Sequence, residues 1–213
     1  MNLYKELQDK LSEHTPTEVD ELILDELFEN VQNFSDQNKK DLEKYTNLIH
    51  LSLNGFGLES LKNFPKLPLL QVLEIRQNKL NGSDFGALKE LYPELYKLKV
   101  GENPIKSLDV FKSLSSSNIK KIEILETPAS TAKDYMDNLF KIMNNVEIID
   151  GKTKEGDEVS STLYEDDEGE FDENDMEDEE FDGNDGEDEL DEYEDEEEQD
   201  EESGSEKPKN GKH

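Results

Sequence analysis

The chain contains no cysteine in its 213 residues. A disulfide framework, a thiolate metal site and a cysteine nucleophile are therefore excluded, and the missing disulfides suit a reducing compartment. Long apolar runs are also missing, because no stretch approaches the ~18 apolar residues of a membrane-spanning helix. The first residues lack the apolar run of a secretory signal. We therefore expect no membrane among the partners of this chain.

Recognisable catalytic and metal-binding patterns are missing as well. The three histidines, His14, His50 and His213, lie far apart in the sequence, and there is no G-x-x-x-x-G-K-[ST] phosphate loop. Residues 182–187 depart from an EF-hand, because Gly186 stands at the fifth, ligand position. We expect no enzymatic activity, no cofactor and no specific metal site. Calcium buffering by the carboxylates remains an alternative, with diffuse and weak binding.

Positive charge is almost absent from the C-terminal quarter of the chain. Of the 56 acidic residues, 31 lie between Glu155 and Glu206, which contains no lysine or arginine, and this leaves 25 acidic residues in positions 1–154. Three of the 23 basic residues follow Glu206 and the other 20 precede Glu155, so residues 1–154 carry a net charge of −5 out of −33. A polyanion resists compaction through self-repulsion, and one poor in apolar residues cannot offset the entropy of ordering. We expect a disordered acidic tail over residues 155–213, ending in a short basic segment. Its partners should be basic proteins, with no direct contact to nucleic acid, whose phosphates it would repel.

Residues 1–154, which we call the head, contain a repeated leucine-rich pattern. Four segments, which begin at Leu48, Leu70, Leu95 and Ile119, follow the template L-x-x-L-x-L-x-x-N-x-L with start spacings of 22, 25 and 24 residues. A degenerate copy precedes them at residues 19–24, and a half-copy follows at residues 146–149. In such repeats a short strand points alternate side chains inward. Neighbouring repeats stack into one core, because no repeat buries its apolar face alone.

The asparagine position of the template is kept in only two of the four copies. Asn78 and Asn103 occupy it there, where a side-chain amide can hydrogen-bond the buried turning backbone. Phe56 and Thr127 occupy it in the other two copies. We expect those two turns to be satisfied in a different way.

Both ends of the solenoid carry candidate caps, which open repeat arrays need. Leu3, Leu7 and Leu11 recur every four residues, as on one face of an amphipathic helix. Residues 134–151 are expected to form a closing helix and turn, and the apolar residues near 88–91 and 108–114 to form helical turns on the convex side. The predicted fold is an α/β leucine-rich repeat solenoid over residues 1–154, with a curved parallel sheet and two caps, followed by the disordered tail.

These segments carry a family resemblance. Residues 11–25, with Thr15 and Pro16 inside them, and residues 134–151 resemble the first repeat and the C-terminal cap of the acidic leucine-rich nuclear phosphoprotein family. The order of head, cap and acidic tail is the same. The resemblance implies a nuclear and also cytoplasmic protein that binds core histones, acts as a histone chaperone and regulates chromatin and transcription.

The resemblance leaves other functions open. It also implies a regulatory inhibitor of a phosphatase or an acetyltransferase complex, acting through the concave surface. A small ribonucleoprotein subunit has a similar leucine-rich fold and cap, which adds a spliceosomal scaffold as a third interpretation. The chain has no spare apolar helix, so we expect a monomer.

Aromatic residues recur within the acidic tail. Residues 170–179 and 180–189 are identical at eight of ten positions, and both begin with an acidic–aromatic–acidic triplet. Drift of low-complexity sequence explains the duplication, but it explains less well why large aromatics persist without a core to fill. We interpret the carboxylates as capture groups for a basic partner and the aromatics as anchors in its apolar pockets. The predicted anchor residues are Phe171, Asp172, Phe181, Asp182 and Tyr193.

A second candidate site lies on the concave side of the predicted sheet. Residues that flank the inward ones there include Arg76, Lys97, Lys99 and Lys121. They would form either a solvated, mixed-charge surface, in which exposed ion pairs contribute only ~0–1 kcal/mol each, or a basic patch. Such a patch would bind an acidic segment, for example the chain's own tail.

Three residues are candidate phosphorylation sites. Thr162 and Ser203 are each followed by glutamate three residues later, and Thr15 precedes a proline. A phosphate adds about −1.5 to −2 units of charge, which would deepen the polyanion. Thr15 also has a simpler interpretation, in which it and Pro16 end the cap helix and lead into the first strand.

Overall fold

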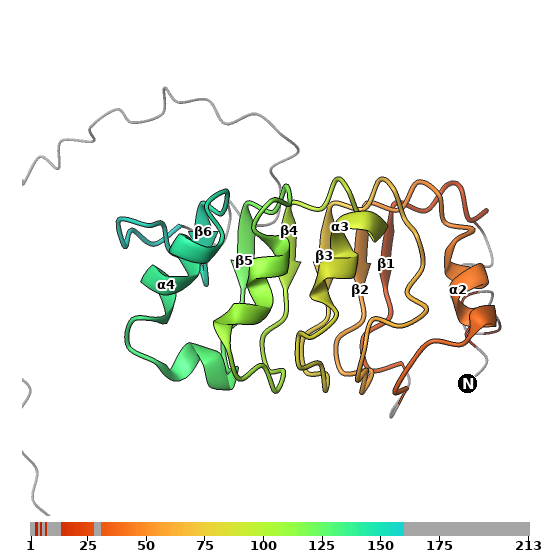
Figure 1. The fold of residues 1–213 in the computed structure, drawn as a ribbon. Helices are drawn as coiled ribbons and strands as arrows, with labels where there is room; N and C mark the ends of the chain where they lie inside the picture. The colour runs from red at the N-terminus through yellow and green to blue at the C-terminus, as the bar shows by residue number, and fades with distance from the viewer. Residues whose placement is uncertain (1–2, 4, 6, 8–13, 28–30, 160–213) are drawn as a thin grey trace, which may run out of the picture. The chain divides into compact units, whose positions relative to one another are not determined.

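The computed structural model describes residues 3, 5, 7, 14–27 and 31–159 (Figure 1). These residues contain one sheet of six parallel strands whose order in space is their order in the sequence. The strands are β1 (Glu21–Ile23), β2 (His50–Ser52), β3 (Val72–Glu74), β4 (Lys97–Lys99), β5 (Lys121–Glu123) and β6 (Ile148–Ile149). Each predicted repeat supplies one strand, and the degenerate copy and the half-copy supply β1 and β6. The predicted parallel sheet is confirmed.

The register of the sheet stacks one apolar residue of every strand in a single row. Leu22 lies opposite Leu51, which lies opposite Leu73, and the pairing continues to β6. The side chains of the row are at most 3% exposed, and burying one such side chain stabilises the fold by about 1.5–3 kcal/mol. The row consists of Leu22, Leu51, Leu73, Leu98, Ile122 and Ile149.

Buried asparagines join consecutive repeats at the turn after the strand. Asn78 Oδ1 accepts from Leu58 N at 2.9 Å, and Asn78 Nδ2 donates to Leu53 O at 3.0 Å. Asn103 makes the same two bonds one repeat later. Each amide therefore satisfies the backbone of the preceding repeat, as the buried turns require.

Of the two turns without asparagine, the one at Thr127 is satisfied differently, as predicted, whereas the backbone at Phe56 is bonded in the same way as that at Asn78. Phe56 is fully buried and meets Phe34 edge to face, with ring centroids 6.3 Å apart. Around Phe56, Leu58 N donates to Asn78 of the following repeat and Leu53 O accepts from it, which are the two bonds that Asn103 makes to the turn at Asn78. Thr127 is the N-cap of a short helix, and its hydroxyl accepts from Ser130 N at 3.2 Å.

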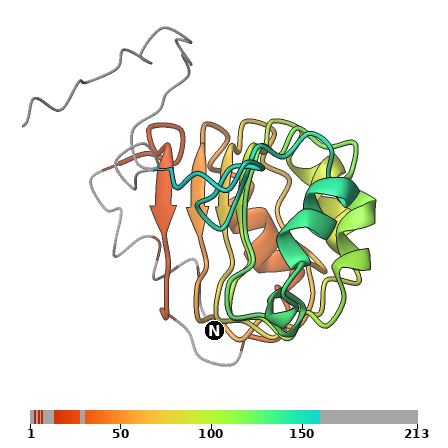
Figure 2. The same ribbon diagram turned by 90° about the vertical axis from the view of Figure 1, so that its left-hand side faces the viewer.

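Helices and helical turns lie on one side of the sheet (Figure 2). The expected helical turns are confirmed as α3 (Leu88–Leu91) and η2 (Leu108–Leu114), in which Leu88, Phe111 and Leu114 are buried. We call this side the helix side and the opposite side of the sheet the strand face. None of the described helices combines the length and the apolar composition needed to span a bilayer. The helical elements are α2 (Asp36–Leu42), η1 (Phe85–Ala87), α3 (Leu88–Leu91), η2 (Leu108–Leu114), η3 (Pro128–Thr131) and α4 (Tyr135–Ile142).

The two predicted caps are present where the structure describes them. Leu3 and Leu7 are helical and buried at 1% and 2% exposure, whereas Leu11 lies outside the described residues. At the other end, α4 and the turn at residues 150–151, which follows β6, form the expected closing helix and turn. The turn after β6 is fixed by Asp150, which accepts a hydrogen bond from Ile124 N at 2.7 Å.

A small hairpin-like turn follows β6 and extends the head. Lys152 forms antiparallel bridges with Ile149 and Glu158, and Val159 N donates to Gly151 O at 2.9 Å. Residues 155–159, which we expected to begin the tail, therefore contact the C-terminal cap. The predicted disordered tail lies otherwise outside the described residues.

Candidate functional site

The strand face presents the residues that flank the buried row. Because successive side chains of a strand point to opposite faces, the register places flanking residues side by side across the sheet. One row runs through Glu21, His50, Val72, Lys97, Lys121 and Ile148. The next row includes Ile23, Ser52, Glu74, Lys99 and Glu123.

A chain of charged contacts crosses the first four strands. His50 Nδ1 lies 2.8 Å from Glu21 Oε1, and His50 Nε2 lies 3.3 Å from Glu74 Oε1. Lys99 Nζ lies 2.9 Å from the same Glu74 oxygen. Glu74 is therefore the central acceptor of this chain, with a side chain only 14% exposed.

These contacts change the protonation of both titratable groups at the centre. The neighbouring Glu74 carboxylate raises the pKa of His50, against the opposing effect of burial, and Glu21 raises it further. Burial alone would raise the pKa of Glu74, but the contacts with His50 and Lys99 outweigh it and lower that pKa to about 2. The pair is therefore stabilised in its charged form.

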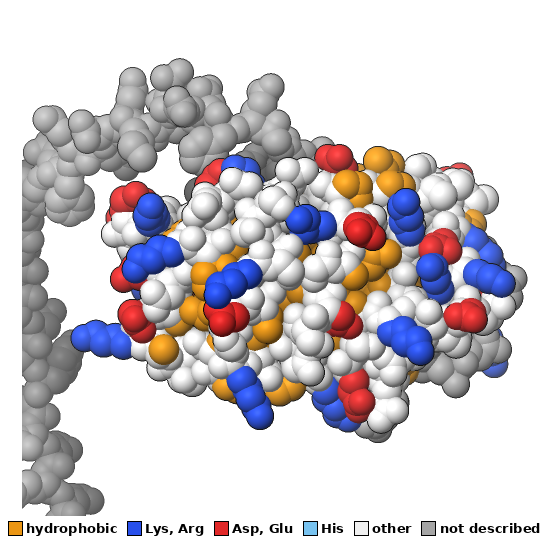
Figure 3. Space-filling view, in the orientation of Figure 1, with side chains coloured by type: hydrophobic (Ala, Val, Ile, Leu, Met, Phe, Trp, Pro, Cys, Tyr) orange, Lys and Arg blue, Asp and Glu red, His pale blue; other side chains and the backbone are white. Residues whose placement is uncertain are grey.

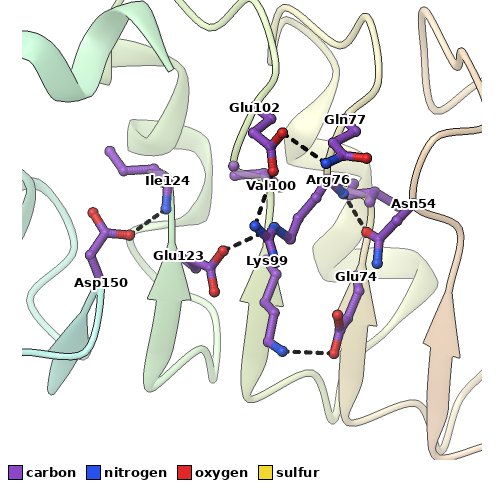
Figure 4. A network of polar contacts seen from close by, with 12 residues as sticks. Asn54, Glu74, Arg76, Gln77, Lys99, Val100, Glu102, Glu123, Ile124 and Asp150 are labelled. Atoms are coloured by element: carbon purple, nitrogen blue, oxygen red, sulfur yellow. Dashed lines mark hydrogen bonds and ion pairs between the residues drawn. The ribbon is translucent and has the colours of Figure 1, made fainter. Parts of the chain in front are cut away.

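A second network surrounds Arg76 at the ends of β3, β4 and β5 (Figure 4). Arg76 Nη2 lies 3.0 Å from Glu102 Oε1, and Arg76 Nε lies 3.1 Å from Glu123 Oε1. The backbone of Arg76 is also held, because its N–H donates to Asn54 Oδ1 at 2.7 Å. One guanidinium thus links three neighbouring repeats, a geometry that suits the planar fork of arginine.

Lys97 is the most enclosed lysine of this face. It is 8% exposed, and burial, followed by the positive charge of Lys99, lowers its pKa. A cavity of about 40 Å³ lies beside it, bounded by Lys99, Lys121 and Ile148 among others. The cavity is large enough for one or a few water-sized groups.

The structure brings all four predicted basic residues together but not as a uniformly basic patch. Arg76, Lys97, Lys99 and Lys121 lie on or next to β3, β4 and β5. Glu74, Glu102 and Glu123 lie among them and pair with Arg76 and Lys99. The surface is therefore of mixed charge, the first of the two interpretations, and a binding role for the four residues stays a prediction.

The pairing of these basic residues with acidic ones was not predicted, although a signal for it is present in the sequence. Glu74, Lys99 and Glu123 each directly follow the buried strand residue of their repeat. Parallel in-register strands must place such equivalent positions side by side. Comparing the same template position across repeats would have predicted the alternation of charge.

Of the other predicted site residues, the structure describes only Thr15. Phe171, Asp172, Phe181, Asp182 and Tyr193, together with Thr162 and Ser203, lie outside the described residues. Thr15 is described, and its hydroxyl donates to Glu18 Oε2 at 2.8 Å. The backbone N–H of Thr15 donates to the same oxygen at 2.8 Å, so Thr15 helps to form the turn before β1.

The strand face can form salt bridges and hydrogen bonds with a partner and also offers apolar contacts. Ile23 lies in β1 and Leu125 lies two residues after β5, and they are 48% and 45% exposed. Among residues 3, 5, 7, 14–27 and 31–159, no group of three or more histidine and acidic side chains is arranged to hold a metal ion. The described side chains of the strand face thus offer charged and apolar contacts.

Known proteins resemble this chain in sequence. It is 32% identical over 168 residues to the acidic leucine-rich nuclear phosphoprotein 32-related protein of Plasmodium falciparum (isolate 3D7), and the match covers 75% of this chain and 59% of that protein. It is 33% identical over 120 residues to acidic leucine-rich nuclear phosphoprotein 32 family member A of Drosophila melanogaster, covering 56% of this chain and 45% of that protein. The chain therefore matches about half the length of these relatives.

Solved structures resemble it in fold. The crystal structure of the Drosophila melanogaster SNF/U2A′ complex contains a chain that matches with a TM-score of 0.54 and 21% identity, covering 63% of this chain and 74% of that chain. Likeness at this identity shows the leucine-rich repeat fold alone. No protein-family model matches the chain. From its relatives in sequence and its repeat fold, the chain is a homologue of the acidic leucine-rich nuclear phosphoprotein 32 family members.

Proposed function

We propose that this protein binds core histones and acts as a histone chaperone in chromatin and transcription regulation, without enzymatic activity of its own. The observation that carries the proposal is the division of charge: residues 155–206 hold 31 acidic and no basic residues beside a head of net charge −5. Such a polyanion attracts a basic surface rapidly and in a salt-dependent way. By shielding that surface, it would prevent wrong contacts between histones and DNA.

The names of the relatives support the compartment. Both are named as nuclear phosphoproteins, which supports a nuclear location here, with presence in the cytoplasm as part of the proposal. Thr162 and Ser203 are the proposed phosphorylation sites in the acidic region. Phosphate at either position would strengthen capture of a cationic partner.

The head contributes a rigid platform in this proposal. Buried asparagines and ion pairs connect its repeats, and most of the charge on its strand face is already paired within the protein. The acidic tail therefore binds the histone, and Phe171, Phe181 and Tyr193 add apolar anchors there. Three such anchors contribute about 5–9 kcal/mol gross, of which ordering the segment consumes about 2–5 kcal/mol.

The test is a titration of labelled core histone dimers and tetramers with the full chain near physiological salt. The variant F171A/F181A/Y193A is expected to lose affinity at least about tenfold, since each buried aromatic contributes over 1 kcal/mol. Its salt dependence should stay close to that of the wild type, because no charge is removed. The matched variant D172N/D182N/E194Q removes three neighbouring charges instead and should mainly flatten the salt dependence.

Two outcomes would contradict the proposal. Failure of the wild-type chain to bind histones would remove the chaperone function. Equal losses from the aromatic and the acidic variants would remove the anchors and leave only charge.

The exposed apolar residues of the strand face favour a second function, regulation of a phosphatase or an acetyltransferase complex. Ile23 and Leu125 flank the charged networks, and a partner could cover all of them together. The variant I23S/L125S should leave histone affinity unchanged under the first proposal. Loss of histone binding in that variant, with full binding in the aromatic variant, would move the interaction to the strand face.

A further inference from the structure

We propose that a groove on the helix side, between η2 and α4, binds a short acidic segment of a partner protein that carries an apolar side chain among its carboxylates. The groove has a volume of about 560 Å³, within the usual range of ligand sites. None of its lining residues belongs to the strand face or to the acidic tail, so the inference concerns a second partner.

The groove exists because one repeat replaces large apolar residues with alanine. The template position held by Ile105 is held one repeat later, 24 residues on, by Ala129. At the same spacing, Leu108 is followed by Ala132. Interiors are otherwise closely packed, so the smaller side chains of η3 and its C-cap leave a space beside η2.

The floor of the groove is apolar. Leu108 and Ile142 pack partly buried against the core, and both line the groove together with Ala129. Apolar side chains also reach the surface among charged ones on the helix side (Figure 3). A leucine-sized or phenylalanine-sized group of a partner would bury area here, at about 25 cal/mol per Å² of apolar surface.

The rim of the groove is positively charged. Three lysines line it, Lys106, Lys112 and Lys141, against one acidic residue, Asp109. Lys112 pairs with Asp109 at 2.7 Å. Within the described part of the chain, Lys106 and Lys141 form no ion pair, which leaves two positive charges beside an apolar floor.

The apolar floor and the positively charged rim together determine which kind of peptide segment can bind in the groove. A basic or neutral segment would leave the two lysines without counter-charges, whereas carboxylates on either side of an apolar residue would match both rim and floor. An extended peptide of four or five residues with acidic ends fits this description.

The experiment measures binding of a fluorescent, end-capped peptide, Glu-Asp-Leu-Asp-Glu, to the full chain by anisotropy. Two comparison peptides, Gln-Asn-Leu-Asn-Gln and Glu-Asp-Gly-Asp-Glu, remove the charge and the apolar side chain in turn. We expect each to bind at least about fivefold more weakly, in keeping with ~1 kcal/mol for a small set of exposed charge contacts or for one apolar group.

Matched variants locate the binding. K106E/K141E should lower the affinity for the acidic peptide at least about fivefold. The control K79E/K154E makes the same charge change at two exposed lysines outside the groove and should change that affinity less than twofold. A132L fills the groove with the residue type found at Leu108 and should also weaken binding about fivefold. Ala132 is exposed with an extended backbone, so thermal unfolding of A132L should match that of the wild type.

Several results would overturn the proposal. These are failure of the wild type to bind the acidic peptide, equal binding of the three peptides, or equal losses in K106E/K141E and K79E/K154E. Sedimentation that shows a dimer abolished by A132L would also overturn it, because a second copy of the chain would then occupy the groove. Histone affinity of K106E/K141E is expected to be unchanged, so a failure of this proposal and a failure of the chaperone proposal can be told apart.

Discussion

The strand face and the helix-side groove use the same residue types in opposite ways. On the strand face, Lys99 lies 2.9 Å from Glu74, so its charge is neutralised by a neighbouring repeat. In the groove, Lys141 lines an apolar hollow and has no ion pair within the described residues. The difference shows that the role of a lysine in this protein depends on what the neighbouring repeat places beside it. Charged groups of the strand face connect repeats, whereas Lys106 and Lys141 of the groove are available to a partner.

The largest loss of stability is expected at Asn103, a buried polar residue that connects two repeats. Asn103→Leu keeps the side-chain volume but leaves Leu80 N and Ile75 O without their bonds to Asn103. Leaving buried polar groups unpaired costs about 1–3 kcal/mol each, so we expect a loss of about 3 kcal/mol in the free energy of unfolding, measured with urea. The counterpart in the groove, Asn138→Leu, removes one exposed bond to Asp134 and should cost less than about 0.5 kcal/mol. Similar losses for the two variants would break the comparison.

A second effect, of about 1–2 kcal/mol, should appear in the pH dependence of stability. The pKa of Glu74 falls to about 2 on folding, so its contribution is present above its unfolded pKa of ~4.3 and is lost as the pH falls toward 2. The pKa of His50 is raised, so its contribution is complete below ~6.5 and is lost as the pH rises through the raised value. The network should therefore stabilise the protein most between about pH 4.5 and 6.5.

The variant Glu74→Gln tests this window. The difference in unfolding free energy between wild type and E74Q should be largest near pH 5.5 and should shrink at pH 2.5 and at pH 8.5. Glu147→Gln serves as the control, because Glu147 is 62% exposed and pairs only with an exposed Lys120. A difference that stays constant across the three pH values would show that the contribution of Glu74 to stability does not depend on its protonation.

The smallest effect compares two lysines directly. Lys99→Gln removes the link to Glu74 and should cost about 0.5–1 kcal/mol, because the pair is partly buried. Lys141→Gln should leave the unfolding free energy unchanged within about 0.3 kcal/mol. Urea unfolding of both variants at pH 5.5 measures the difference. If K141Q is the more destabilised of the two, the groove lysine has a structural role and the comparison fails.

Local patterns predicted most of the head but not all of its ends. The spacing of Leu48, Leu70 and Leu95 predicted three of the strands, because apolar residues at a fixed spacing must share one core. Helix α2 was missed: its capping box pairs Ser35 with Asn38, where the usual motif has glutamate or glutamine. The turn at residues 155–159 was also missed, because its acidic composition resembles that of the tail, whereas its bridges depend on contacts with β6.

The candidate sites were less predictable than the fold. The sequence identified Arg76 and Lys99 as residues of the strand face but not the ion pairs that they form, since an ion pair needs two side chains within about 4 Å. The groove was not predicted at all. Ala129 stands where the other repeats have leucine or isoleucine, but this departure was not noted, and the space it leaves depends on how closely η2 and α4 approach.

By itself, the sequence determined the repeat number, the order of the strands and the separation of a near-neutral head from a polyanion. These properties follow from composition and spacing, because burial of apolar residues is non-directional and depends only on which face they share. Only the tertiary structure decided that Glu74 meets both His50 and Lys99, that Asn103 joins two repeats, and that two alanines open a groove. Hydrogen bonds, ion pairs and packing all require atoms of distant residues to lie within a few ångströms of one another, and the arrangement of neighbouring repeats sets those distances.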